Sequence, residues 1–205
     1  KFAEKHGESH WLELVEPSKG SKLQGWSSME KMITDMDAAS ICQAVLLGWY
    51  WENPNSSIQH NDWHYKWIKE DPERFYAFAS IHPAMSQPVE ELRKRLDQGF
   101  VGMGECHAGV QRFTMRDPIW LKCVEFASEK GWPIAQFNLG WLYRKGYGVE
   151  IDLPRAYMWL HSSGTMGYEK ARKNKRILEK ELKPVPLARA KFLAYHCKEK
   201  QYKDC

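Results

Sequence analysis

The fold class is decided by residues 74–81, which read RFYAFASI. This short apolar and aromatic run predicts a β-strand. Two further apolar runs precede and follow it at similar distances, residues 44–47 (AVLL) and 100–104 (FVGMG). Helical patterns separate and follow these runs, at residues 27–40, 60–69, 88–96 and 117–131. The run at 44–47 is apolar throughout, which predicts a strand buried on both faces.

Alternation of strands and helices at this spacing predicts right-handed βαβ units and a parallel sheet. Such sheets place their chemistry at the carboxyl ends of the strands. The residues at these ends are Trp49, Tyr50, Trp51, Glu52, His82, Pro83, Glu105, Cys106 and His107. We therefore expect any functional site of the first part to be built from this set.

Four segments of this part resemble the middle of an amidohydrolase-superfamily barrel, of the branch that includes the TatD-type nucleases. They are residues 71–75 (DPERF), 81–83 (IHP), 99–105 (GFVGMGE) and 127–134 (ASEKGWPI), and the resemblance covers residues 25–134. It implies part of a (β/α)₈ barrel and a metal-dependent hydrolase in which a divalent ion, most commonly zinc, activates water.

The metal ligands that this resemblance implies are incomplete. Glu105 matches the glutamate that TatD-type enzymes use, and His107 and His82 lie close to it in the expected layout. Those enzymes also take a His-x-His pair from their first strand, and this sequence contains no such pair. Glu105, His107 and His82 are therefore the candidate metal ligands, and it stays open whether the chain is an enzyme. A strand-end glutamate held by a hydrogen bond or salt bridge is the alternative.

His60 and His64 form a second histidine pair, four residues apart in the pattern expected for a helix. This spacing places both rings on one helix face and permits metal chelation. The glutamate and third ligand of the metalloprotease pattern are missing, so the sequence favours two exposed histidines.

From residue 135 the pattern becomes helical throughout. Helices are expected at residues 135–143, after the capping residue Asp152, at 169–182 and at 187–197. Gly140 is expected to let two helices approach closely, and Gly146 and Gly148 to adopt positive φ in the turn between the first two.

This second part resembles a Sel-like repeat, a short relative of the tetratricopeptide repeat. The residues that carry the resemblance are Leu139, Gly140, Tyr143, residues 146–149, Asp152, Ala156, Trp159, Gly167 and Ala171. It implies antiparallel helix pairs that bind a protein partner or a second copy of the chain. A repeat unit cannot bury its face alone, so exposed aromatic residues are candidates for the contact. The candidate partner-binding residues are Trp141, Tyr147 and Tyr157.

The sequence thus predicts an α/β segment, residues 1–134, followed by an all-α segment, residues 135–205. The start at Lys1 without methionine and the abrupt change of pattern after Gly131 favour a fragment or a fusion. Three readings stay open: a hydrolase segment fused to a repeat, a non-catalytic adaptor, and a chimeric product without a selected function.

Charge and cysteine content limit the possible partners and surroundings. Residues 131–205 hold 15 basic and 7 acidic residues, a net charge of +8, within a chain whose net charge is +4. We read this as a solvated basic helix face rather than a nucleic-acid contact. No apolar run approaches the roughly 20 residues of a membrane span. Five cysteines without a C-x-x-C pair predict free thiols and a cytoplasmic setting.

Overall fold

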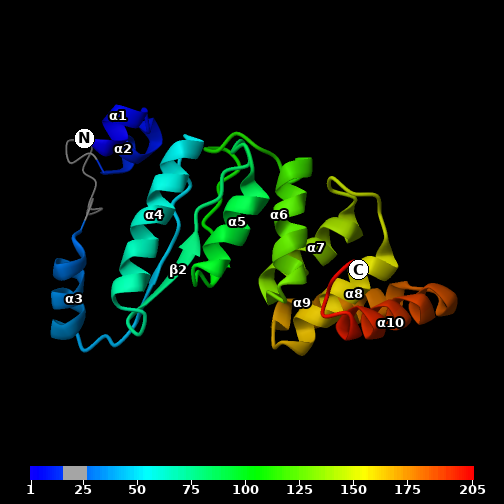
Figure 1. The fold of residues 1–205 in the computed structure, drawn as a ribbon. Coiled ribbons are helices and arrows are strands. Elements are labelled where there is room, and N and C mark those ends of the chain that lie inside the picture. The colour runs from blue at the N-terminus through cyan, green and yellow to red at the C-terminus, as the bar shows by residue number, and fades with distance from the viewer. Residues whose placement is uncertain (16–26) are drawn as a thin grey trace. The chain divides into compact units, whose positions relative to one another are not determined.

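The computed structural model describes residues 1–15 and 27–205 (Figure 1). Mixed α/β structure is followed by helices alone, and the chain forms two compact units, Lys1–Phe113 and Thr114–Cys205. Residues 25 and 26, which begin the segment resembling an amidohydrolase, lie outside the described residues.

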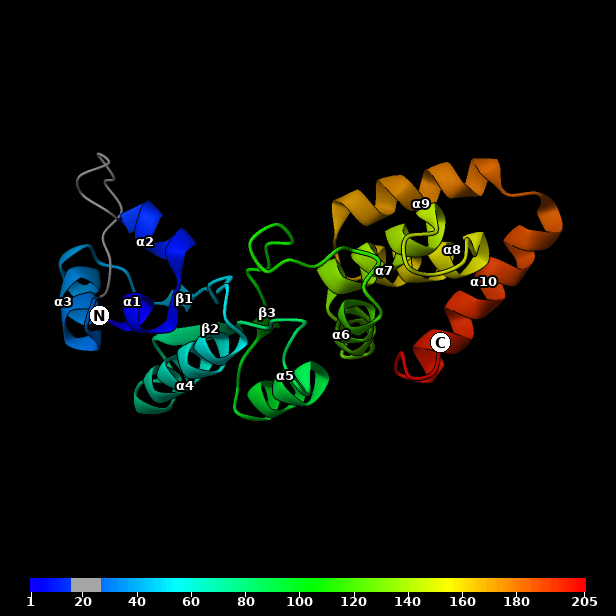
Figure 2. The same ribbon diagram turned by 90° about the horizontal axis from the view of Figure 1, so that it is seen from above.

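Unit 1, residues 1–113, is a small parallel sheet with helices. Its elements are α1 (Phe2–His6), α2 (Ser9–Val15), α3 (Met29–Ala38), β1 (Ala44–Leu46), α4 (Pro54–Glu70), β2 (Phe75–Ala79), α5 (Pro88–Asp97) and β3 (Gly102–Met103). The sheet order is β1-β2-β3; Val45 is in register with Tyr76, and Ala79 with Met103. Figure 2 shows α4 and α5 on the same side of the strands. The predicted strands and parallel pairing are confirmed, and the short helices α1 and α2 were not predicted.

Strand β1 differs from the prediction in its burial. The apolar run 44–47 was expected inside the sheet, but β1 is an edge strand of the sheet formed by the described residues. Val45 and Leu47 are each 52% exposed, whereas Leu46 is buried. An apolar run does not reveal its place in the sheet order, and for this reason the expectation of a fully buried strand was wrong.

A polar cluster in the core of unit 1 joins α4 to β2 and α5. The Asn61 side chain accepts a hydrogen bond from the Ser80 amide at 2.7 Å and donates one to the Ser80 carbonyl at 2.9 Å. The Arg95 side chain is fully buried, with its Nε 2.6 Å from Glu91 Oε1 and its Nη2 2.7 Å from Asp62 Oδ1. These bonds satisfy polar groups that would otherwise destabilise the core.

Unit 2, residues 114–205, consists of helices. They are α6 (Pro118–Glu129), α7 (Pro133–Lys145), α8 (Leu153–Thr165), α9 (Glu169–Glu181) and α10 (Pro184–Glu199). Helix α8 packs against α7, α9 and α10, and α6 packs against α7. The two compact units divide before α6, so α6 and its buried residues belong to unit 2. The two segments predicted from the sequence divide later, between residues 134 and 135.

The turn and contact between α7 and α8 follow from glycines. A side chain at Gly140 would begin 3.0 Å from the Ala156 carbonyl oxygen, so the two helices approach closely enough that a side chain would force them apart slightly. Gly146 ends α7 with φ of 70°, which L residues with side chains rarely adopt. Asp152 caps α8 by accepting a hydrogen bond from the Arg155 amide at 2.9 Å. The predicted close approach, positive φ and cap are confirmed.

Two features near the C-terminus differ from the sequence-based expectation. Helix α10 begins at Pro184 rather than at residue 187, because proline is well suited to the first position of a helix. Cys197 and Cys205 form a disulfide, whereas free thiols were predicted; Cys42, Cys106 and Cys123 are not in a disulfide. The eight-residue separation gave no recognisable pattern. None of the helices among the described residues combines the length and apolar character needed to cross a bilayer.

Candidate functional site

The carboxyl ends of the strands of unit 1 bring several chemically active side chains together. The Tyr50 and His107 rings lie with centroids 5.1 Å apart, and the His10 ring lies 5.7 Å from Tyr50 and 6.4 Å from His107. Burial raises the pKa of Tyr50, and the negative charge of Glu105 raises it further. His10 comes from α2, far away in the sequence, so local patterns gave no signal for it.

The two candidate histidine ligands use a ring nitrogen within their own turns. His82 Nδ1 accepts a hydrogen bond from the Ala84 amide at 3.0 Å, and His107 Nδ1 accepts one from the Val110 amide at 3.2 Å. A neutral imidazole that accepts at Nδ1 carries its proton on Nε2. Neither histidine therefore presents a free lone pair to a metal ion in this arrangement.

The predicted ligands also do not converge into a coordination set. Over residues 1–15 and 27–205, no group of three or more His, Cys, Asp or Glu side chains is placed to hold a metal ion. Zinc sites need three or four protein ligands. The donor set at Glu105, His107 and His82 therefore does not fit a bound zinc ion as these side chains are arranged. Metal binding there stays a prediction.

Zinc titration tests this arrangement directly. We expect Glu105→Ala to bind Zn²⁺ with the same affinity and stoichiometry as the wild type, because neither His82 nor His107 presents a free lone pair. Isothermal titration calorimetry measures both quantities. A stoichiometric zinc ion in the wild type that is lost in Glu105→Ala would restore the metal site implied by the amidohydrolase resemblance.

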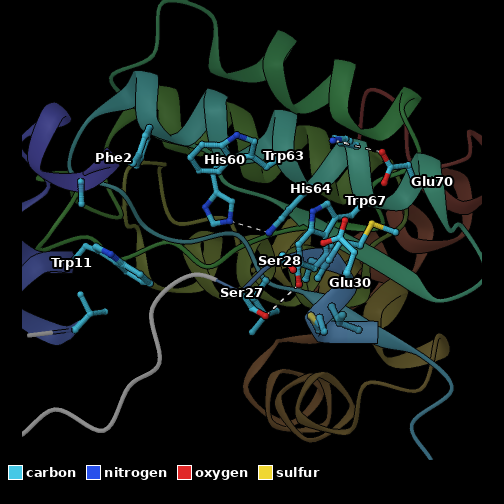
Figure 3. Close-up of a pocket in the computed structure, with 18 of the residues that line it drawn as sticks. Phe2, Trp11, Ser27, Ser28, Glu30, His60, Trp63, His64, Trp67 and Glu70 are labelled. Atoms are coloured by element: carbon cyan, nitrogen blue, oxygen red, sulfur yellow. Dashed lines mark hydrogen bonds and ion pairs between the residues drawn. The ribbon is translucent and has the colours of Figure 1, made fainter. Parts of the chain in front are cut away.

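A cavity lies in the same unit, between α4, the N-terminal helices α1 and α2, and the edge strand β1 (Figure 3). Its volume is about 1080 Å³, and its walls include Phe2, Trp11, Trp63 and Trp67. Lys1, Glu30, Lys66 and Glu70 also line it. His60 and His64 face one another along the wall formed by α4.

The hydrogen bonds of the histidine pair determine where each proton lies. Trp51 Nε1, which can only donate, lies 2.6 Å from His60 Nδ1, so this nitrogen accepts. The His60 proton is then on Nε2 and is donated to His64 Nε2, 2.9 Å away. His64 in turn carries its proton on Nδ1. A metal ion bound between the two Nε2 atoms would require a proton on His60 Nδ1, where the Trp51 N–H already points, so the pair does not suit chelation.

Burial holds the histidine pair neutral. It lowers the pKa of His60 well below the ordinary value, with His64 contributing further, and lowers the pKa of His64 to about 4. His60 is buried and His64 is partly buried, whereas the sequence favoured exposure for both. The helical spacing was predicted correctly, but Trp51, which determines the tautomer, lies outside the helix.

The three candidate partner-binding residues of unit 2 have different surroundings. Trp141 and Tyr147 are partly buried and pack edge to face with centroids 5.1 Å apart, and the Arg116 guanidinium lies over the Tyr147 ring. Tyr157 is only 2% exposed, and its hydroxyl donates to Glu179 at 2.9 Å. Helix α9 covers most of this face of α8, so Tyr157 offers little surface, and its contact role stays a prediction.

Helix α10 instead exposes an apolar stripe that was not predicted. Val185, Phe192 and Tyr195 are 80%, 60% and 64% exposed. At 100° per residue they lie on one side of the helix, opposite the buried residues Ala190, Ala194 and Cys197. The helix predicted over residues 187–197 contains Phe192 and Tyr195, and its helical spacing would have placed both on one side.

Comparison with known proteins adds no relative to this picture: no family model matches the chain, and no curated protein matches it.

Proposed function

We propose that unit 2 is a protein-binding module whose contact surface is the outward stripe of α10, defined by Val185, Phe192 and Tyr195. The observation that carries the proposal is the exposure of these three large side chains along one side of α10. In stacked helical repeats, such a face is normally covered by the next helix. The resemblance to a Sel-like repeat supports the same conclusion.

The chemistry of the surface indicates an acidic partner. Arg189 lies on one side of the stripe, and Lys191 and Lys198 lie on the other, by their positions on the helix. The carboxylate of Glu199, which lies within the stripe, is hydrogen-bonded to Tyr195. Residues 131–205 carry a net charge of +8, so a second copy would bring like charges together. An amphipathic helix with apolar residues on one face and acidic residues at its borders matches both the stripe and its charges.

A defined peptide pair tests this proposal. We expect the full chain to bind a synthetic helical peptide with leucines at i, i+3, i+4 and i+7 and glutamates at the borders. The expected dissociation constant is on the order of micromolar. A peptide of the same composition in scrambled order should bind at least tenfold more weakly. Fluorescence anisotropy measures both.

Two variants test whether the peptide binds at the outward stripe of α10. Phe192→Ser with Tyr195→Ser should weaken peptide binding by about 2 kcal/mol, because aromatic anchors dominate such interfaces. Ile177→Ser, which removes an exposed apolar side chain from α9, is the matched control and should bind like the wild type. Equal binding of the ordered and scrambled peptides, or concentration-dependent dimerisation in sedimentation that Phe192→Ser abolishes, would contradict the proposal.

The hydrolase function implied for residues 25–134 stays a second, weaker proposal. The resemblance supports it, as does the gathering of Tyr50, Glu105 and His107 at the strand ends. The use of the His82 and His107 lone pairs within their own turns counts against it. The zinc titration described above decides between these observations.

A further inference from the structure

A small cleft between α8 and α10 lies next to the outward stripe. Its volume is about 240 Å³, and it is lined by Tyr157, His161, Lys191, Ala194, Tyr195 and Lys198. The four residues from α10 are spaced at i, i+3, i+4 and i+7, so they share one helix face. Ala194 is small and buried, and this leaves space between the two lysines. Tyr195 belongs to both the cleft and the stripe, so the two surfaces are continuous.

Positive charge in and around the cleft is only partly neutralised. The Glu179 carboxylate is bound by Lys175 Nζ at 3.0 Å and by the Tyr157 hydroxyl at 2.9 Å. Glu199 forms a hydrogen bond with Tyr195 that raises the pKa of this phenol. Lys191 and Lys198 form no ion pair with a carboxylate in the part of the chain that the structure describes, although Glu179 attracts Lys191 from a longer distance. The cleft therefore has two lysines that can bind an anion beside the tyrosine rings.

His161 reports on the charge in this cleft. Burial lowers its pKa, and the positive charges of Lys175 and Lys198 lower it further, while Glu179 opposes them. An anion bound beside Lys198 would stabilise the protonated imidazole and raise this pKa. The ring also packs against Tyr157, with centroids 6.0 Å apart, so it is held in a defined position.

We propose that the α8–α10 cleft binds a carboxylate side chain, with Lys191 and Lys198 on either side of the carboxylate and the Tyr195 ring against its methylene groups. This inference rests on the proposed function, because it identifies the cleft as the place where the acidic partner helix inserts one glutamate or aspartate. Charge-assisted hydrogen bonds from the two lysines supply the attraction.

A small probe tests the cleft without the partner. In the full chain, millimolar N-acetylglutamate amide should raise the pKa of His161, followed by the NMR shift of its ring protons, whereas N-acetylglutamine amide should not. The double variant Lys191→Gln/Lys198→Gln should lose the response. Lys173→Gln/Lys180→Gln removes the same charge from α9 and should keep it. An unmoved His161 pKa in the wild type, or an equal rise in Lys191→Gln/Lys198→Gln, would overturn the inference.

The peptide of the previous section separates this inference from the proposed function. We expect Lys191→Gln/Lys198→Gln to weaken peptide binding by about tenfold, and Lys173→Gln/Lys180→Gln by less than about twofold. Peptide binding that is equal in the two double variants would leave the module intact and overturn the cleft. A His161 response to the small probe without any peptide binding would overturn the module and leave the cleft.

Discussion

Replacing Arg95 with alanine is expected to lower the free energy of unfolding of unit 1 by about 3 to 5 kcal/mol. The side chain is fully buried, and its guanidinium is paired with Glu91 at 2.6 Å and Asp62 at 2.7 Å. A third hydrogen bond runs from Nη1 to Gln98 Oε1 at 3.1 Å. In Arg95→Ala, the largely buried Glu91 carboxylate would lose its charged partner. Among the described residues, it would keep the hydrogen bond from the Asn61 side-chain amide, 3.1 Å away. Loss of a buried charge partner costs far more than loss of a surface pair.

Arg93 offers the matched control two residues earlier on the same helix. Its guanidinium pairs with Glu90 at 3.3 Å, but the side chain is 47% exposed. Arg93→Ala should therefore change stability by less than about 1 kcal/mol. Urea unfolding gives the free energies, and hydrogen exchange shows whether the loss falls on the amides of unit 1. Equal losses in the two variants would show that Arg95 is not the central ion pair of this core.

Acidification is expected to destabilise unit 1 through His60 and His64. Their pKa values are lower in the folded chain than the ordinary value of 6.5, that of His64 being about 4. Between pH 6.5 and pH 4 the unfolded chain binds more protons than the folded chain, so the free energy of unfolding falls as pH falls. The contribution of His64 is fully present above pH 6.5. By linkage, protonation of His64 alone should lower the free energy of unfolding by about 2 kcal/mol between pH 6.5 and pH 5, and by about 3 kcal/mol by pH 4.

His64→Gln isolates this effect. The glutamine oxygen can still accept the proton that His60 donates, but the residue no longer titrates. Urea unfolding of both proteins between pH 7 and pH 5 avoids most carboxylate titration. We expect the wild type to lose stability more steeply than His64→Gln over this interval. Parallel profiles would mean that His64 is accessible to protons in the folded chain.

The helices from α3 onward were predicted because their signals are local, although α4 begins at Pro54 rather than at residue 60. Asp117 accepts hydrogen bonds from the two amides that follow Pro118, and Ser28 accepts one from the Lys31 amide; both residues stand at the start of a range predicted to be helical. Alternating strands and helices likewise predicted the parallel sheet. The predicted range for α10 began after Pro184 and Pro186, whereas proline is favoured in the first turn of a helix and α10 begins at Pro184.

The strand ends predicted which residues lie near the candidate site, but not the contacts that those residues make. Glu105 and His107 were placed correctly at the end of β3, but the use of His107 Nδ1 by the Val110 amide depends on how the following turn folds. The approach of His10 from α2 and of Trp51 to His60 depends on contacts between distant segments. Such contacts have no signature in a single sequence, and the same holds for the cover that α9 provides to Tyr157.

The edge position of β1 has a consequence for concentrated solutions of this protein. Val45 and Leu47 present branched aliphatic groups along a strand whose outer backbone groups face away from β2. A strand of this kind is a template for sheet growth between molecules, and many proteins protect such strands with lysine or proline gatekeepers. Residues 44–47 contain neither. Ordered aggregation of unit 1 should therefore begin at this strand.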